Sequence, residues 1–164
     1  MRTIPLTQGY STIVDDLDYE ELSKYKWCYA DGYAVRRRWC KEEKRYYTVK
    51  MHREIINAPK GLLVDHKDGN KLNNIRSNLR ICTHTENVRN SQKPRNNTTG
   101  YKGVRHGRKR RKDGSYHEFY LAEIRVNNKL IVGNWKKTAI EAARQYNELA
   151  LKYHGEFARL NGGV

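Results

Sequence analysis

The sequence predicts an α+β fold made of two modules. Short runs rich in Tyr, Val and Trp, separated by turn residues, predict hairpins in the first half. In the second half, alternating runs are followed by one apolar helical stripe, which predicts a sheet packed on a helix. The polar stretch between them, residues 91–100 (SQKPRNNTTG), has the Pro, Asn and Gly content of a linker. We therefore expect domains at residues 1–92 and 101–164, joined by a linker at 93–100.

The first module is expected to combine short strands with short helices. The expected strands are residues 3–6, 26–30, 33–39, 45–50, 62–64 and 79–82. The expected helices follow a cap at Asp16 or Asp18, span residues 51–56, and follow a cap at Thr83 or Thr85. The dipeptide Asp31-Gly32 lies between two of these strands and is typical of a tight hairpin turn.

The second module is expected to fold as three antiparallel strands followed by one helix. The strands are residues 103–106, 119–126 and 129–133, with Asn127-Asn128 as a turn. Thr138 and Glu141 form a capping box, and the apolar residues after them recur every three or four positions. This pattern places one face of the helix in the core, and we expect Trp135 to be core as well.

The composition predicts a partner of opposite charge. Lys and Arg number 33 against 18 Asp and Glu, which gives a formal net charge of +15. Residues 1–92 carry 17 basic and 12 acidic side chains, whereas the shorter segment 93–164 carries 16 and 6. Such an excess favours a polyanion, and nucleic acid is the obvious one.

Several other classes of protein are disfavoured. No apolar run approaches the roughly 18 residues of a membrane helix, and the N-terminal residues lack the apolar centre of a secretory signal. The cysteines Cys28, Cys40 and Cys82 are odd in number and form no CxxC pair. This argues against both a disulfide framework and a zinc ribbon. We therefore expect a reduced, soluble protein with no membrane partner.

The stretch from Asp65 to Asn74, with Asn78 and Asn87 beyond it, holds residues suited to phosphodiester hydrolysis. That reaction needs an activated water, a base that takes its proton, and a cation near the leaving oxygen. Asp65 and Asn87 offer the oxygen ligands that a hard divalent cation prefers. His66 has the pKa range of a general base near neutral pH. A strand–loop–strand–helix order can bring Asp65 and Asn87 to one point.

Each of these residues also has a structural interpretation. By spacing alone, His66 is equally well a turn histidine with its hydrogen bonds satisfied, and Asn78 is a scaffold for the loop backbone. His52 with Arg53 is a candidate phosphate contact or, equally, a histidine packed at a helix start. His84 is a further candidate for a ligand or a phosphate contact.

Residues 64–74 (VDHKDGNKLNN), with Asn78-Leu79-Arg80 and Glu86-Asn87, resemble the HNH endonucleases of phages and of intron-encoded homing enzymes. The resemblance covers residues 2–92 and implies a ββα-metal nuclease domain with added hairpins. It implies that Asp65 and Asn87 bind a divalent metal, magnesium or manganese, that His66 activates water, and that Asn78 ties the loop. Asn87 stands where the family often has histidine. The resemblance also implies a cytoplasmic location in a bacterial or phage-infected host cell.

A run of basic residues in the second module is a candidate DNA-binding element. Seven of the residues 102–112 are basic, and the run adjoins expected strands. A sheet face with Arg and aromatic side chains fits the major groove, and a basic loop at 108–114 would then clamp the backbone. The expected clamp residues are Arg108, Lys109, Arg110 and Arg111. The alternative for such a run is a solvated, mobile loop.

Residues 103–105, 120–125, 132–135 and 139–143 resemble the plant ethylene-response-factor (Apetala-type) DNA-binding domain, and the likeness runs from 99 to 161. The sheet of that family reads duplex DNA. The resemblance therefore implies that the DNA readers are Lys102, Arg105, Arg125 and Lys129. The first loop is longer here, and Ile131 stands where a groove-facing Trp is common, so no base preference is implied.

The sequence thus predicts a metal-dependent, site-directed endonuclease that cuts duplex DNA, of the homing or phage nicking type. One active site per chain predicts nicking by a monomer without a protein partner, and double-strand cleavage by a dimer stays open. The alternatives are a DNA-binding regulator without catalysis and an RNA-binding protein. A regulator needs the basic sheet but has no use for a convergence of Asp65, His66 and Asn87.

Overall fold

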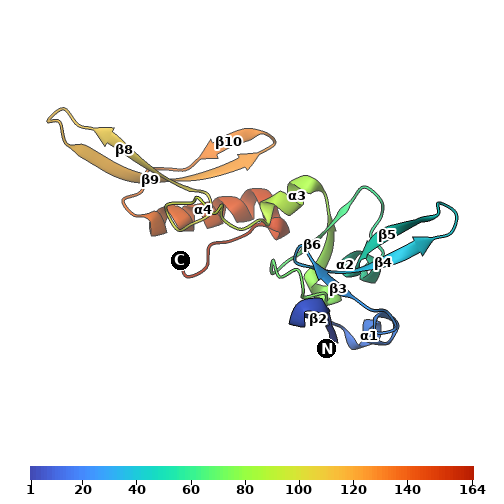
Figure 1. Ribbon diagram of the computed structural model, residues 1–164. Helices are drawn as coiled ribbons and strands as arrows, with labels where there is room; N and C mark the ends of the chain where they lie inside the picture. The colour runs from blue at the N-terminus through green and yellow to red at the C-terminus, as the bar shows by residue number, and fades with distance from the viewer. The chain divides into compact units, whose positions relative to one another are not determined.

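The computed structural model describes all 164 residues, which divide into two compact units, residues 1–87 and 88–164 (Figure 1). The division falls earlier in the chain than the expected linker at 93–100. That segment is bound within the second unit, where Asn97 Nδ2 donates to Tyr101 O at 2.8 Å and Thr99 Oγ1 donates to Val104 O at 3.1 Å. No helix in either unit has both the length and the apolar composition needed to cross a membrane.

The first unit consists of three small antiparallel sheets and short helices. Its strands are β1 (Arg2–Pro5), β2 (Ser11–Val14), β3 (Cys28–Ala30), β4 (Tyr33–Cys40), β5 (Arg45–Lys50), β6 (Leu63–His66) and β7 (Leu79–Cys82). Its helices are α1 (Asp16–Leu22) and α2 (Met51–Ile55), and α3 (His84–Arg89) follows β7. The strands pair as β1-β2, β3-β4-β5 and β6-β7. Apart from β2, every one of these elements was expected, with ends that differ by a few residues.

Strand β2 is the element that the sequence pattern did not predict. It pairs with β1 in the register Arg2↔Val14, and its side chains alternate so that Thr12 and Val14 are fully buried. Four residues are too few to separate a strand from a loop by periodicity alone. The turn before β2 is sharp because Gln8 and Gly9 both adopt positive φ angles.

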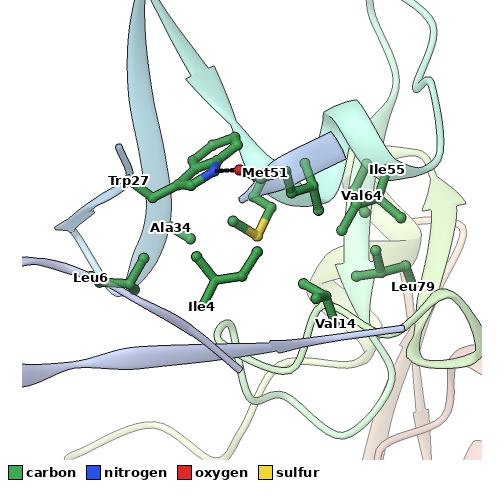
Figure 2. Packing of buried hydrophobic residues seen from close by; sticks show 10 residues of the cluster. Ile4, Leu6, Val14, Trp27, Ala34, Met51, Ile55, Val64 and Leu79 are labelled. Carbon is green, nitrogen blue, oxygen red and sulfur yellow. Dashed lines mark hydrogen bonds between the residues drawn. The ribbon is translucent and has the colours of Figure 1, made fainter. Parts of the chain in front are cut away.

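The core of the first unit gathers apolar side chains from every sheet and from α1 and α2 (Figure 2). Trp27 and Met51 are its largest fully buried side chains. The indole Nε1 of Trp27 donates to the carbonyl oxygen of Leu22 at 2.8 Å, which satisfies the one polar atom of that ring. Val64 and Leu79 join the β6–β7 hairpin to this core. The hairpin that carries the candidate site is therefore fixed on one face by apolar packing.

The second unit is a three-stranded antiparallel sheet packed on one helix, as expected. The strands β8 (Val104–Arg110), β9 (Tyr116–Val126) and β10 (Lys129–Val132) lie in the order β10-β9-β8, and α4 (Ala139–His154) packs against them. Thr138 and Glu141 form the expected capping box. Gly103 has a φ of +68°, and a Cβ there would lie 2.1 Å from the Tyr146 ring, so the close contact of sheet and helix requires glycine.

Two expectations about this unit were wrong. Strands β8 and β9 are longer than predicted, so that Arg108, Lys109 and Arg110 lie in a two-stranded ribbon instead of a loop. The run itself gives no strand signal, and pairing with residues 116–118 of β9 extends the strand through it. Trp135 is 53% exposed, and its ring stacks on Phe119 with centroids 4.2 Å apart. It covers one side of the sheet from solvent and is not a core residue.

Candidate functional site

Asp65 and His66 are the last two residues of β6, in the hairpin that β6 forms with β7. The register pairs Asp65 with Arg80 and His66 with Leu79. Successive side chains of a strand point to opposite faces, so the two candidate residues have different neighbours. Asp65 is 6% and His66 4% exposed. The site is therefore built into the hairpin and is not a feature of a surface loop.

Asp65 forms a buried ion pair with Arg80. Nε and Nη2 of Arg80 donate to Oδ2 of Asp65 at 2.9 and 2.6 Å, and the two side chains are only 10% and 7% exposed. Sequence reasoning did not single out Arg80, because the expected strand ended at residue 64 and gave no cross-strand partner for Asp65. The hairpin register would have shown it. This arginine neutralises the candidate metal ligand in the free protein.

The face of β7 that carries Arg80 also carries Cys82. Burial raises the pKa of the Cys82 thiol, and the negative charges of Asp65 and Glu86 raise it further. Glu86 belongs to the first turn of α3, where its Oε2 accepts hydrogen bonds from the backbone N–H and the hydroxyl of Thr83. The start of α3 therefore lies near the Asp65 side of the hairpin. Strand, strand and helix follow one another in the order that the HNH resemblance implies.

His66 lies on the opposite face, in a buried polar cluster. Its Nε2 is 3.1 Å from Oδ1 of Asn74, and Nδ2 of Asn74 is 2.7 Å from the hydroxyl of Thr12. Its ring centroid is 5.2 Å from that of His52, with the planes nearly perpendicular. Burial lowers the pKa of His66, against the opposing effects of Asn74 and the nearby carboxylates. The imidazole is therefore neutral at neutral pH, the state that a general base requires.

Asn78 holds the loop between β6 and β7. Its Oδ1 accepts from the backbone N–H of Asp68 at 3.1 Å, and its Nδ2 donates to Asp68 Oδ1 at 3.0 Å and to Asn73 O at 2.8 Å. The side chain is 7% exposed. Through these contacts Asn78 links the backbone of Asp68 to that of Asn73.

The two residues expected on the following helix are both in α3. Asn87 is half-buried, and its backbone N–H donates to Thr83 O at 3.1 Å. His84 is the first residue of α3 and is exposed. No group of three or more His, Cys, Asp and Glu side chains gathers anywhere in the structure as a metal site would. A metal at this hairpin therefore needs amide, water or substrate oxygens in addition to Asp65.

His52 and Arg53 have the contacts of structural residues. His52 is 4% exposed and packs between the rings of His66 and Tyr33, whose centroids lie 5.2 and 5.0 Å away. The two terminal nitrogens of Arg53 donate to the backbone carbonyls of residues 58, 59 and 62. The burial of His52 and the backbone contacts of Arg53 favour a packing role for both residues over a phosphate contact.

The burial of His52 predicts an acid-sensitive fold. Burial lowers the pKa of His52 to about 3, with a further contribution from His66. The unfolded chain binds this proton near pH 6.5 and the folded chain does not, so the free energy of unfolding should decrease as the pH falls below 6.5. One such histidine contributes a slope of up to about 1.4 kcal/mol per pH unit. Urea denaturation between pH 7 and pH 5 should show a steeper loss for wild type than for His52→Leu, and parallel slopes would contradict this.

In the second unit, alternation along the sheet separates a face that packs on α4 from an outer face. Val104, Ala122 and Ile124 point to α4, which places Arg105, Lys109 and Arg125 on the outer face. Arg125 is exposed, as is Arg105, which forms an ion pair with Glu123. Lys109 lies over the ring of Trp135, with Nζ 5.7 Å from the centroid. This face therefore combines guanidinium, ammonium and exposed aromatic groups.

The remaining basic candidates lie at the far end of the β8–β9 ribbon, except Lys129, which is the first residue of β10. Arg108 lies over the Tyr116 ring at 4.9 Å, Nη2 of Arg111 is 3.4 Å from His117 Nδ1, and Arg110 and Lys129 are exposed. These side chains are accessible to a polyanion. Their positions are compatible with the expected phosphate contacts, although the element that carries them is a ribbon.

Lys102 is placed differently from the other candidates. Its Nζ donates to the backbone carbonyls of Arg89 and Ser91, the latter at 2.6 Å, and burial lowers its pKa to about 8. The ammonium group is thus used to fix the chain that leads into the sheet. The sequence could not indicate this, because Lys102 stands in the same basic run as the exposed residues.

A pair of substitutions separates DNA binding by an exposed arginine from the structural role of Lys102. We expect Arg125→Ala to reduce the slope of log affinity for duplex DNA against log salt by about one unit, because one exposed cationic side chain is lost from the outer sheet face. Lys102→Met should leave that slope unchanged and lower the free energy of unfolding instead. Fluorescence anisotropy over a salt series, together with urea denaturation, measures both. A slope change in Lys102→Met without loss of stability would contradict the structural role.

Comparison with known proteins links the chain to nucleases. A family model described as HNH endonuclease matches residues 57–89, the segment that holds Asp65, His66, Asn78 and Asn87. The chain is 34% identical over 145 residues to a protein of Acanthamoeba polyphaga mimivirus named "Uncharacterized HNH endonuclease L560", an alignment that covers 85% of this chain and 68% of that protein. It is 33% identical over 132 residues to "Protein 3.8" of Escherichia phage T7, which covers 73% of this chain and 97% of that protein.

No solved structure matches the chain. The family-model match ends at residue 89, so it does not bear on the Apetala-type resemblance of residues 99–161. The expectation that the second unit binds DNA therefore depends on the residues and the sheet geometry described above.

Proposed function

The chain belongs to the HNH endonuclease family, and from this premise we propose that it is a metal-dependent, site-directed endonuclease that hydrolyses phosphodiester bonds in duplex DNA. The observation that carries the proposal is the β6–β7 hairpin, which holds a buried neutral His66 on one face and the buried carboxylate of Asp65, the preceding residue, on the other. The viral origin of both relatives supports the further proposal of a phage nicking or homing enzyme.

The donor set at the hairpin fits a hard divalent cation. HNH nucleases generally use a divalent metal, and Asp65 with Asn87 would hold it here through a carboxylate and an amide oxygen. Magnesium is commonly held by only one or two carboxylates together with substrate phosphate and water, which agrees with the absence of a preassembled ligand cluster. Asp65 already binds a cationic group, the guanidinium of Arg80. When bound, the metal would stabilise negative charge on the leaving oxygen.

His66 is proposed as the general base. Its low pKa keeps the ring unprotonated at neutral pH, so that it can take the proton of the attacking water. Asn78 keeps the loop after His66 in place through three hydrogen bonds. The chemistry thus depends on residues that the hairpin and its loop position before any substrate binds.

The second unit is proposed to supply affinity for duplex DNA. Its outer sheet face carries Arg105, Lys109 and Arg125, and the β8–β9 ribbon adds further basic side chains. A two-stranded ribbon fits the major groove, where arginine pairs with guanine edges and lysine or arginine binds phosphate. We propose that one chain acts as a monomer and nicks one strand.

A second candidate function is a DNA-binding regulator without catalysis. The observation that favours it is the ion pair with Arg80 that engages Asp65. Conversion of supercoiled plasmid to the nicked form separates the two functions. We expect conversion with magnesium or manganese and none with EDTA. Duplex binding without any conversion in either metal would favour the regulator.

A further inference from the structure

Three buried polar side chains from distant parts of the first unit form a line that ends at His66. Thr12 comes from β2 and Asn74 from the loop after β6, and both are 0% exposed. The hydroxyl of Thr12 donates to Leu72 O at 2.7 Å, Asn74 Nδ2 lies 2.7 Å from that hydroxyl, and Asn74 Oδ1 lies 3.1 Å from His66 Nε2. Backbone hydrogen bonds also hold strand β2 against the loop at residues 72–74, since Ile13 N donates to Leu72 O and Asn74 N donates to Ile13 O.

The direction of these hydrogen bonds follows from the single proton of the Thr12 hydroxyl. Leu72 O can only accept, so the short contact to it requires that proton. The hydroxyl must then accept from Asn74, which places the amide nitrogen at Thr12. Met51 Sδ lies 3.8 Å from the same nitrogen and is also an acceptor. With the amide reversed, an acceptor oxygen would face the sulfur and lie 2.7 Å from the hydroxyl, whose one proton cannot serve both that oxygen and Leu72 O at such short distances.

The orientation of Asn74 determines which nitrogen of His66 carries the proton. Its Oδ1 can only accept, so His66 Nε2 must donate, and the neutral ring has its basic lone pair on Nδ1. His52 packs edge-on against the ring and helps to hold its plane. A general base needs both a fixed tautomer and a fixed orientation, because the wrong tautomer presents a donor to the attacking water.

We propose that Thr12 and Asn74 are positioning residues, which set the tautomer of His66 so that Nδ1 accepts the proton of the attacking water. The inference rests on the proposed function of His66. It gives strand β2, which lies far from the hairpin in the sequence, a part in catalysis. Thr12 is the remote determinant, since its one proton orders the whole line from Leu72 O to His66.

The tautomer can be measured without activity, by long-range ¹H–¹⁵N correlation of the imidazole of His66 in the metal-free protein. We expect the wild type and Thr12→Ser to carry the proton on Nε2. Thr12→Val removes the hydroxyl with little change of shape and should give a mixture of tautomers. It should lower kcat for cleavage by about 10–100-fold while KM and duplex binding change little, as for other residues that orient a functional histidine. Thr12→Ser keeps the hydroxyl and should therefore retain the wild-type kcat.

Thr3→Val makes the same chemical change at an exposed position of β1 and serves as the matched control. It should leave both the tautomer and kcat unchanged. A wild-type His66 with its proton on Nδ1 would overturn the inference, as would a Thr12→Val variant with unaltered tautomer and kcat. If Thr12→Val folds poorly, the wild-type and Thr12→Ser spectra still show which nitrogen of His66 carries the proton. Cleavage that persists in His66→Ala would instead contradict the proposed function.

Discussion

Replacement of His66 by alanine is expected to lower the rate of DNA cleavage by about 10²–10⁴-fold, the usual cost of removing a general base. Duplex binding should change little, because the basic side chains proposed to bind DNA belong to the second unit. The rate is measured by single-turnover cleavage with saturating protein, and binding by fluorescence anisotropy in EDTA.

His84→Ala provides the control for this experiment. His84 is an exposed histidine at the start of α3, and its loss removes the same ring from a position outside the buried cluster. We expect at most a small change in its cleavage rate. Metal-dependent cleavage at the wild-type rate in His66→Ala would show that another group takes the proton.

Affinity for duplex DNA is expected to fall about 10³-fold when salt rises from about 50 to about 200 mM. The reason is the release of counterions from the phosphates that the basic side chains neutralise. If about six phosphates are contacted, the slope of log affinity against log salt is near −5. A titration of a labelled duplex at four or five salt concentrations gives this slope directly.

The same titration tests the β8–β9 ribbon. Replacing Arg108 and Arg110 by alanine should reduce the slope by about two units, since both side chains are exposed along β8. A slope that is flat in the wild type, or equal in wild type and variant, would contradict the ribbon as a phosphate-binding element.

Local signals in the sequence were enough for most of the fold. Turn residues such as Asp31-Gly32, the capping box at Thr138 and the apolar stripe of α4 are each determined by nearby residues, and the elements they predicted are present. Strand β2 and the length of the β8–β9 ribbon depend instead on pairing with another strand. Such pairing is not visible in a short polar or basic segment.

The residues of the candidate site also divide into those that the sequence motif reveals and those that only the folded structure reveals. The sequence motif singles out Asp65, His66, Asn78 and Asn87, because the chemistry of each residue type is known. Their partners Arg80, Asn74 and Thr12 are determined by register and by burial, which no single residue reveals. Lys102 shows the reverse case, since its place in a basic run indicates DNA binding while its contacts are with backbone carbonyls.

A crystal structure with manganese and a non-hydrolysable duplex would locate the metal through its anomalous scattering. We expect one manganese ion bound by the Asp65 carboxylate and the Asn87 amide oxygen, with His66 Nδ1 facing the scissile phosphate. Asp65 held only by Arg80, with Asn87 turned away and no manganese between them, would contradict it and leave a protein that binds DNA without cutting it.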